Sequence, residues 1–354
     1  MELRSLDIKN EDDVAYYNAF VNKYAPPGHN MTLNYLEPLM EAYDHEVHIL
    51  AAFENGVLVG VLPLVGMRSS FFGHRLVSLP FYNYGGVLSA NFSTKASLIK
   101  AAKEHMHAWH YSSLVIRNVD SDPTYEQLGF SCSTDKATFF YRLPSDINKV
   151  GAGNSKKRSK LRSQSLLAER RTKESGDRLR TAFGGSELLD DFYTVFSEHM
   201  RDLGTPVFSK AWFRSVLAST SSIITVVYIN EKPLATGFIL SHENTKRWSI
   251  PWASCLKEGN AISLNSYMYY QILSQAIEHN IDIFDFGRST IESGPYRFKQ
   301  QWGAEPTKCH WYQYPSDNSP GPKKEGFGLA VKLWKRLPLF VANRLGPHLS
   351  RTLG

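Results

Sequence analysis

The sequence lacks any long hydrophobic run and has few cysteines. No stretch of about 18 apolar residues occurs in the 354-residue chain, so we expect no membrane-spanning helix. Residues 1–10 carry charges where a signal peptide needs an apolar core, which predicts a cytoplasmic protein. The cysteines, Cys132, Cys255 and Cys309, are far apart and have no metal-ligand spacing, so we expect reduced thiols.

Patterns typical of metal sites and of covalent nucleophiles are also missing. His105, His107 and His110 lie close in sequence, but only His107 and His110 share a helix face. No carboxylate or cysteine completes that pair, so we expect no metal. Neither a Gly-x-Ser-x-Gly motif nor a Cys-His pattern stands out, which argues against a nucleophilic triad.

Acidic residues are scarce in two segments. Residues 151–180 contain ten lysines and arginines against three acidic residues, and residues 321–354 contain seven against one. Because the net charge of the whole chain is +6, the remainder carries a net −7. This distribution, an acidic body with two basic segments, predicts an anionic partner that binds at defined places on the protein.

A repeated pattern runs through most of the chain. Residues 51–64 and 226–240 each predict a strand, a turn and a second strand, with Gly60 and Gly237 at matching positions. Each hairpin precedes an amphipathic helix, a short strand and an aromatic strand, the strands being 114–117 and 138–143 in one copy and 283–286 and 308–314 in the other. The shared order predicts an internal duplication of an acetyltransferase-like α/β unit.

One motif lies near the end of the second copy. The segment Gly294-Pro-Tyr-Arg-Phe-Lys299, followed by Trp302-Gly303, resembles the Gly-x-Tyr-x-Phe-Lys-x-x-aromatic-Gly signature of the Fem peptidyltransferase family. Together with residues 79–87, 201–206, 251–254 and 284–289, it resembles a FemAB-like branch that accompanies exopolysaccharide and PEP-CTERM systems.

The resemblance implies an α/β protein with two tandem GNAT-like domains, each a mixed sheet flanked by helices, with the acceptor held between them. We expect these domains at residues 1–150 and 177–316, joined by a basic linker at 151–176 and followed by a basic amphipathic tail at 317–354. Known Fem members transfer from aminoacyl-tRNA to a lipid-linked peptidoglycan precursor. They insert a long helical arm associated with tRNA binding, for which residues 177–316 leave no room.

Acyl-CoA and aminoacyl-tRNA both stay open as donor substrates, and neither is expected as a bound cofactor. The loop of CoA-dependent GNAT domains holds the pyrophosphate on backbone amides at a helix N-terminus. Residues 256–265 occupy that place and retain one of its usual two glycines. Ser263 or Asn265 is expected to cap the following helix, which accounts for these residues without a ligand.

The motif suggests three catalytic residues. Lys299, flanked by aromatic residues such as Tyr296, would present its ammonium to a phosphate or a developing oxyanion. The alternative is a solvated lysine on a helix face. Asp285 and Arg288 lie at the end of a predicted strand, where they serve ligands or form a structural ion pair. We expect the fold to survive Lys299→Ala, because the side chain would be exposed.

Further residues are expected to contact substrate: Tyr82, Asn83, Tyr84, Arg201, Trp252, Asn265 and Tyr296. The loop at 82–84 either lines the acceptor cleft or covers an edge of the core. Arg201 ends a helix, where an anion or the helix dipole alone accounts for it.

These features predict an N-acyltransferase or aminoacyltransferase that modifies an amine on a cell-envelope or exopolysaccharide precursor, which could be lipid-linked. The alternative is a non-catalytic protein that binds a glycan carrier or scaffolds polysaccharide assembly. The linker is either a solvated segment or a binding site for the phosphates of RNA or lipid. The tail either packs on the body or lies on the anionic inner face of the membrane, which would make the protein peripheral.

Overall fold

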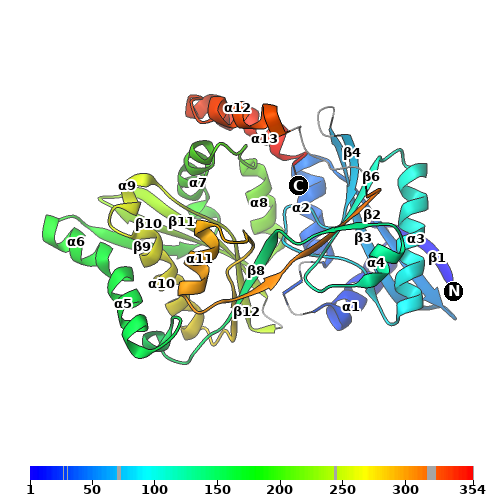
Figure 1. The fold of residues 1–354 in the computed structure, drawn as a ribbon, viewed down its shortest axis with the longest axis horizontal. Coiled ribbons are helices and arrows are strands. Elements are labelled where there is room, and N and C mark those ends of the chain that lie inside the picture. The colour runs from blue at the N-terminus through cyan, green and yellow to red at the C-terminus, as the bar shows by residue number, and fades with distance from the viewer. Residues whose placement is uncertain (27, 30, 70–72, 243–244, 317–323, 354) are drawn as a thin grey trace. The chain divides into compact units, whose positions relative to one another are not determined.

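The computed structural model describes residues 1–26, 28–29, 31–69, 73–242, 245–316 and 324–353. The chain forms two compact units (Figure 1). Unit 1 comprises Met1–Lys136, Lys308–Phe327 and Leu349–Gly354, and unit 2 comprises Ala137–Thr307 and Gly328–His348. Each unit contains one mixed sheet flanked by helices, which confirms the predicted α/β architecture.

The sheet of unit 1 has the strand order β1-β2-β3-β4-β6-β16-β7, with β5 paired to β3. Its strands are β1 (Glu2–Leu6), β2 (Glu46–Glu54), β3 (Val57–Ser69), β4 (Gly73–Val77), β5 (Leu88–Ser89), β6 (Ser113–Asn118), β7 (Ser131–Ser133) and β16 (His310–Tyr314). Its helices are α1 (Glu11–Tyr24), α2 (Leu33–Tyr43), α3 (Phe92–Ala108) and α4 (Pro123–Gln127). Strands β4 and β6 run parallel.

The sheet of unit 2 has the order β14-β8-β13-β12-β11-β10-β9, with β15 paired to β8. Its strands are β8 (Lys136–Arg142), β9 (Leu179–Gly184), β10 (Ser222–Ile229), β11 (Lys232–His242), β12 (Arg247–Cys255), β13 (Ile283–Asp285), β14 (Ser289–Thr290) and β15 (Glu305–Lys308). Its helices are α5 (Ser155–Ser165), α6 (Leu167–Ser175), α7 (Leu189–Leu203), α8 (Lys210–Ser219), α9 (Lys257–Asn260), α10 (Leu264–Glu278), α11 (Gly294–Gln301), α12 (Lys324–Trp334) and α13 (Leu339–Ser350). Short 3-10 turns lie at Ile147–Lys149 and Ser186–Leu188.

Gly60 and Gly237 occupy equivalent places in the two sheets. Gly60 lies in β3 opposite Ala52 of β2, and Gly237 lies in β11 opposite Thr225 of β10. A Cβ on Gly60 would meet side chains of α3, and one on Gly237 would meet Ile272 of α10. In each unit, glycine therefore lets the central helix approach the sheet closely, as the repeat predicted.

Two strands join a different sheet from the one that their place in the repeat predicted. Strand β8, expected in the first copy, pairs with β13 of unit 2, with Asp285 opposite Phe140. Strand β16, expected in the second copy, pairs with β6 and β7 of unit 1. Short strands carry little local information about which sheet they join, because pairing depends on tertiary neighbours. The boundaries at residues 150 and 177 stay a proposal.

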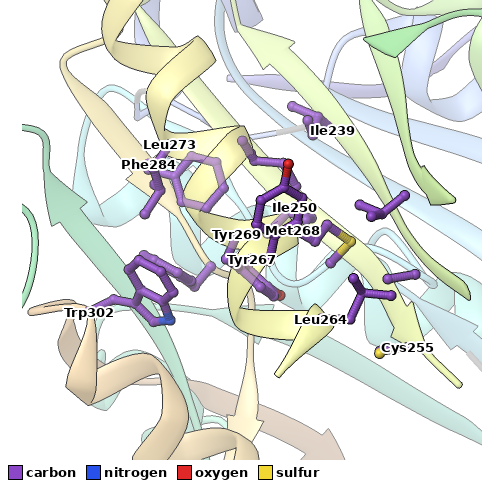
Figure 2. Packing of buried hydrophobic residues seen from close by; sticks show 14 of the residues in the cluster. Ile239, Ile250, Cys255, Leu264, Tyr267, Met268, Tyr269, Leu273, Phe284 and Trp302 are labelled. Carbon is purple, nitrogen blue, oxygen red and sulfur yellow. The ribbon is translucent and has the colours of Figure 1, made fainter. Parts of the chain in front are cut away.

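The core of unit 2 forms between α10 and the sheet, and the aromatic residues of the motif belong to it (Figure 2). Trp302 is 1% exposed, and its ring lies 6.3 Å from that of Tyr269 in α10. The Phe298 ring lies 5.2 Å from the same tyrosine. The motif aromatics therefore fix α11 against α10 by burying apolar area.

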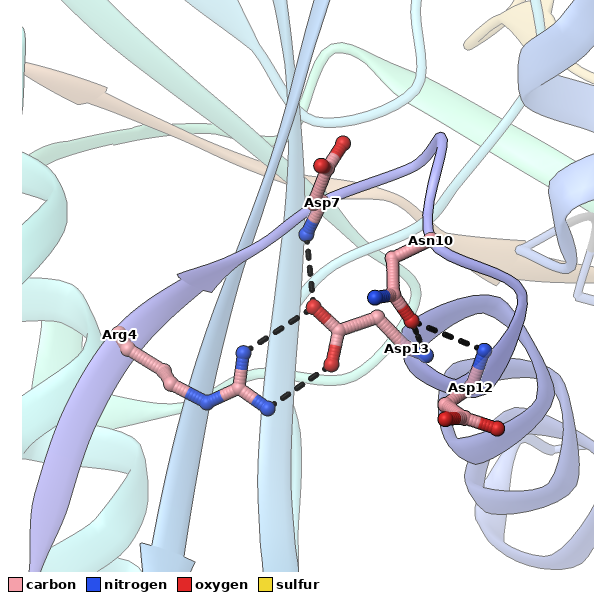
Figure 3. Close-up of polar contacts among 5 residues, drawn as sticks. All are labelled: Arg4, Asp7, Asn10, Asp12 and Asp13. Atoms are coloured by element: carbon pink, nitrogen blue, oxygen red, sulfur yellow. Dashed lines mark hydrogen bonds and ion pairs between the residues drawn. The ribbon is translucent and has the colours of Figure 1, made fainter.

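The N-terminal strand is tied to α1 by polar contacts (Figure 3). The Asn10 side-chain oxygen caps α1 by accepting from the amides of Asp12 and Asp13, at 3.0 and 3.1 Å. The Arg4 guanidinium donates to both carboxylate oxygens of Asp13. This hydrogen bond is the main reason that the pKa of Asp13 is lowered.

Helices α12 and α13 of the C-terminal tail pack on unit 2, whereas the last residues, Leu349–Gly354, belong to unit 1. A Cβ on Gly204, which ends α7, would lie 2.6 Å from Val331 of α12, and one on Gly346 of α13 would lie 2.9 Å from Val207. Arg201 of α7 donates to the carbonyl of Leu337, between α12 and α13, at 3.1 Å. In the part of the chain that the structure describes, no helix is long and apolar enough to cross a membrane.

Candidate functional site

The parallel strands β12 and β13 of unit 2 separate after a short contact. Their register runs from Arg247 opposite Ile283 to Ser249 opposite Asp285, where the pairing ends. Strand β12 continues to Cys255, and within the described residues β11 is its only partner over this part. Beyond Ser249, β12 therefore has an open edge on the side opposite to β11, because β13 diverges from it there.

A bulge in β12 accompanies this separation. Ser249 lies opposite Leu240 and Trp252 lies opposite Phe238, so β12 carries one more residue than β11 over this interval. Pro251 falls within the interval, and proline has no N–H to donate to a ladder. The sequence predicted no strand at residues 251–254, which contributed only to the resemblance. Pro251 is the one local sign of the bulge.

The direction of the β12 amides follows from the hydrogen bond at the end of the strand. The Leu256 amide donates to the carbonyl of Leu234, on the β11 side, at 2.9 Å. Backbone groups alternate along a strand, so the Ser254 amide also faces β11. The amides of Ala253 and Cys255 then point to the other side, along the open edge.

Asp285 shapes the turn that follows β13. Its side chain is 1% exposed, and its Oδ1 accepts from the Gly287 amide at 2.8 Å and from Thr138 Oγ1 at 3.1 Å. Gly287 has a φ of 72°, in the left-handed region that favours glycine. Thr138 was not foreseen, because its strand was expected in the other copy of the repeat.

Lys299 lies on the inner face of α11 and bonds to this turn. Its side chain is 7% exposed, so the expectation of an exposed lysine is wrong. The ammonium donates to the carbonyls of Gly287 and Arg288, each at 2.9 Å, and lies 5.5 Å from the Phe139 ring centre. A buried ammonium needs such partners, because burial without them costs several kcal/mol.

The three residues expected to be catalytic therefore meet at one turn. Asp285 accepts a hydrogen bond from the Gly287 amide in this turn. Lys299 donates to the carbonyls of Gly287 and Arg288. Arg288 is itself part of the turn and is half-buried. Tyr296, on the outer part of α11, packs edge-on against Phe139 at 4.9 Å. Through these hydrogen bonds, Asp285 and Lys299 position the backbone of the turn.

Unit 1 fills the equivalent place with its own chain. Its parallel pair β4 and β6 is extended by Ser78, whose amide donates to the Val115 carbonyl at 2.9 Å. Ser78 Oγ accepts from the Arg117 amide at 3.0 Å, and the Gly85 amide donates to the Arg117 carbonyl at 2.9 Å. Residues 78–85 thus cover the edge that unit 2 leaves without a strand.

The expected polar loop at residues 82–84 belongs to this covering segment. Tyr82 is 1% and Tyr84 4% exposed, and Asn83 between them is half-buried. Burial raises the pKa of the Tyr82 phenol. The sequence left two alternatives for this loop, one that lines the acceptor cleft and one that covers an edge of the core. The burial of both tyrosines fits the second.

Two other expected substrate contacts have structural partners. The Arg201 Nε lies 2.7 Å from Asp202 Oδ1, and Lys257 Nζ lies 2.9 Å from Asp202 Oδ2. Trp252 is 6% exposed, with ring contacts at 5.2 Å to Phe213 and 5.3 Å to Phe238. It belongs to an aromatic core between the sheet and α8.

Helix α10 begins just beyond β12. Ser263 occupies its N-cap position with a φ of 58°, and no side chain caps the helix, so the expected cap by Ser263 or Asn265 is wrong. The half-buried Asn265 instead places its amide against the Cys255 thiol, whose pKa burial raises to about 12. A Cβ on Gly259 would lie 3.1 Å from that sulfur, which explains the retained glycine.

Most of unit 2 is similar in sequence to a known protein family. Residues 155–300 match the family described as an acetyltransferase (GNAT) domain. This segment of unit 2 is therefore similar in sequence to GNAT acetyltransferase domains. No curated protein matches the chain by sequence. Within the described residues, no group of three or more His, Cys, Asp or Glu side chains is placed to hold a metal ion.

Solved structures extend the likeness to both units. A structure of FemX has a TM-score of 0.64 at 15% identity, over 89% of this chain and 97% of the other. A tandem GNAT protein from the clavulanic acid biosynthesis pathway gives 0.60 at 12%, over 91% and 100%. L-PGS from Bacillus licheniformis gives 0.56 at 13%, over 93% and 98%. The fold is therefore that of two tandem GNAT-like domains, as the Fem resemblance implied.

Proposed function

We propose that this GNAT-fold acyltransferase moves an acyl or aminoacyl group onto an amine of a cell-envelope or exopolysaccharide precursor. One observation carries the proposal: β12 presents an edge that β13 leaves unpaired in unit 2. The same position in unit 1 is covered by residues 78–85. Donor binding is therefore assigned to unit 2.

The open edge of β12 offers backbone donors for the reacting carbonyl. The amides of Ala253 and Cys255 point along this edge, where they would polarise the donor carbonyl and bind the oxyanion of the tetrahedral intermediate. The acceptor amine attacks that carbonyl carbon, so a C–N bond forms. The C–S bond of a thioester or the C–O bond of an aminoacyl ester then breaks, and the amine proton passes to the leaving group or to water.

The turn after β13 would define the other wall of the reaction site. Asp285 and Lys299 hold this turn through the Gly287 amide and carbonyl. Arg288 lies on it and is half-buried as a residue, and we assign its guanidinium to an anionic part of a substrate. Arg288 and Tyr296, both in unit 2, are partly exposed, which fits direct contact with ligand.

Acyl-CoA is the donor that GNAT domains typically use. The uncapped N-terminus of α10 lies next in sequence to the β12 edge and suits a pyrophosphate. The segment before this helix retains one glycine of the usual two, so it has less of the open loop that ordinarily holds the pyrophosphate. Aminoacyl-tRNA is the competing donor.

The names of the structural neighbours support an envelope acceptor. They include FemX and a putative lysylphosphatidylglycerol synthetase from Agrobacterium fabrum, which gives a TM-score of 0.56 at 12% identity. We place the reaction at the cytoplasmic face of the membrane, on a precursor that is lipid-linked. Assignment to the exopolysaccharide-associated branch rests on the sequence motifs.

A donor comparison tests this function. The purified protein is incubated with a cell-envelope lipid extract and either labelled acetyl-CoA or labelled aminoacyl-tRNA, and products are identified by mass spectrometry. We expect label on an amine of the extract from one of the two donors. Binding of the extract without transfer from either donor would instead indicate a non-catalytic carrier-binding or scaffold protein.

The β12 edge is tested by a matched pair of variants. Ala253→Pro removes the N–H that faces the edge, whereas Ala253→Ser retains it. We expect the proline variant to lose about 100-fold in kcat and the serine variant to keep most activity. If the proline variant does not fold, acetyl-CoA is titrated into nitrogen-15-labelled wild-type protein. Unchanged Ala253 and Cys255 amide signals under saturating donor would refute the assignment.

A further inference from the structure

The exposed apolar side chains of unit 2 gather in one place. Among the described residues of this unit, its exposed large apolar side chains all lie on α12, on α13 or at the end of α7. They are Leu203 at 52%, Leu329 at 64%, Leu333 at 57%, Phe340 at 76% and Leu345 at 46% exposure. Figure 1 shows both helices along the same side of the unit, beside α7. We call this set the α12–α13 face.

The α12–α13 face points away from the protein. On α12, Val331 contacts the end of α7. Leu329 and Leu333 are one turn apart on the opposite side of the helix. On α13, Ala342 is 2% exposed and faces inward, whereas Phe340 has the most exposed side chain of the set. Packing on the body therefore uses one side of each helix and leaves an apolar side outward.

Cations surround these apolar side chains. Lys332, Lys335, Arg336 and Arg344 are all exposed, and no acidic residue occurs between Gly328 and His348. An apolar strip of this kind is ordinarily bordered by both signs of charge on a soluble helix. Uniform positive charge around exposed Leu and Phe side chains is complementary to a surface with an anionic outer layer and an apolar layer below it.

We propose that the α12–α13 face docks on the surface of an anionic lipid bilayer. Leu329, Leu333 and Phe340 enter the boundary between headgroups and acyl chains, and the four cations contact lipid phosphates. Neither helix is long enough to span, so attachment is peripheral and reversible. RNA binding would not need the exposed aliphatic side chains, and base stacking would need more aromatic ones. The inference goes beyond the transfer reaction and does not depend on it.

Flotation with lipid vesicles tests the proposal without any measurement of activity. The full-length protein is mixed with vesicles of phosphatidylcholine alone or with about one third phosphatidylglycerol. We expect binding to the anionic vesicles, and release of most of the protein by high salt. In Leu329→Ser/Leu333→Ser/Phe340→Ser, the bound fraction should fall about tenfold. The control is Phe92→Ser, which alters an equally exposed side chain (61%) in unit 1.

A second variant separates charge from apolar contact. Lys332→Gln/Arg336→Gln should weaken binding to anionic vesicles by about tenfold and leave circular dichroism unchanged. Equal binding by the wild type and the triple serine variant would overturn the proposal. It would also be overturned if the wild type ignored anionic vesicles and eluted as a dimer that the triple variant abolishes. In that case, the face would join two copies of the chain.

Discussion

Lys299 Nζ lies 2.9 Å from the carbonyl oxygen of Gly287, so a buried ammonium of α11 closes the turn that Asp285 begins. The same turn carries Arg288. The most specific residue of the motif therefore acts on backbone geometry next to the open edge of β12. The ammonium lies 5.5 Å from the ring centre of Phe139, against which Tyr296 packs edge-on.

Lys299→Ala should destabilise unit 2 as well as lower activity. It removes two charge-assisted hydrogen bonds and leaves two buried carbonyls without this donor, so we expect a loss of about 2–4 kcal/mol in the free energy of unfolding. Arg297→Ala, on the exposed side of the same helix, is the control and should change it by less than about 0.5 kcal/mol. Urea denaturation measures both, and equal stability of the two variants would contradict a positioning role.

Gly294 permits a test that separates ligand contact from folding. It begins α11, and a Cβ there would meet no atom within 4 Å. Gly294→Ala should therefore leave the protein as stable or raise its unfolding free energy by about 0.5 kcal/mol. If a substrate approaches this helix end, activity should fall more than tenfold through KM. A stable variant with unchanged KM would remove Gly294 from the substrate site.

The sequence predicted much of the architecture because its signals are local. The matching positions of Gly60 and Gly237 reflect close helix–sheet contacts that recur in each unit, and a repeat is visible in a single sequence. The meeting of Asp285, Arg288 and Lys299 was likewise within reach, since these residues are close together in the sequence and belong to the same resemblance.

Other features depend on distant parts of the chain. Lys299 could not be identified as buried from its neighbours, because its partners are backbone carbonyls of the preceding turn. The sheet that β8 joins is decided by its pairing with β13, and Thr138 therefore reached Asp285 without a sequence signal. The divergence of β12 depends on a bulge whose only local sign was Pro251.

Gly60 and Gly237 should differ in their tolerance of alanine. A Cβ on Gly60 would lie 2.7 Å from Thr94 Cγ2 and 3.2 Å from the backbone oxygen of Leu88, whereas one on Gly237 would meet the flexible ends of Ile250 and Ile272, at 2.9 and 3.2 Å. We expect Gly60→Ala to cost about 2–3 kcal/mol and Gly237→Ala about 1 kcal/mol. Hydrogen exchange localises each loss, to α3 for the first variant and to α10 for the second. Similar costs at both positions would argue against the geometry.

His45 should make the stability of unit 1 dependent on pH. The side chain is 6% exposed, and burial, helped by the charge of Arg351, lowers the pKa of its ring to about 4. The unfolded chain titrates near a pKa of about 6.5, so between these values the unfolded state binds more protons. Stability from a neutral His45 is therefore fully present above about pH 6.5 and is lost as the pH falls toward 4.

A His45→Gln variant isolates this contribution, because His242 in unit 2, with a pKa also lowered to about 4, stays in place as an internal reference. Urea denaturation at several pH values should give the wild type an extra loss of up to about 1.4 kcal/mol per pH unit between 6.5 and 4. The variant should lack this part of the slope and be the less pH-sensitive protein. Parallel pH profiles for the two proteins would show that His45 protonates as easily in the folded chain as in the unfolded one.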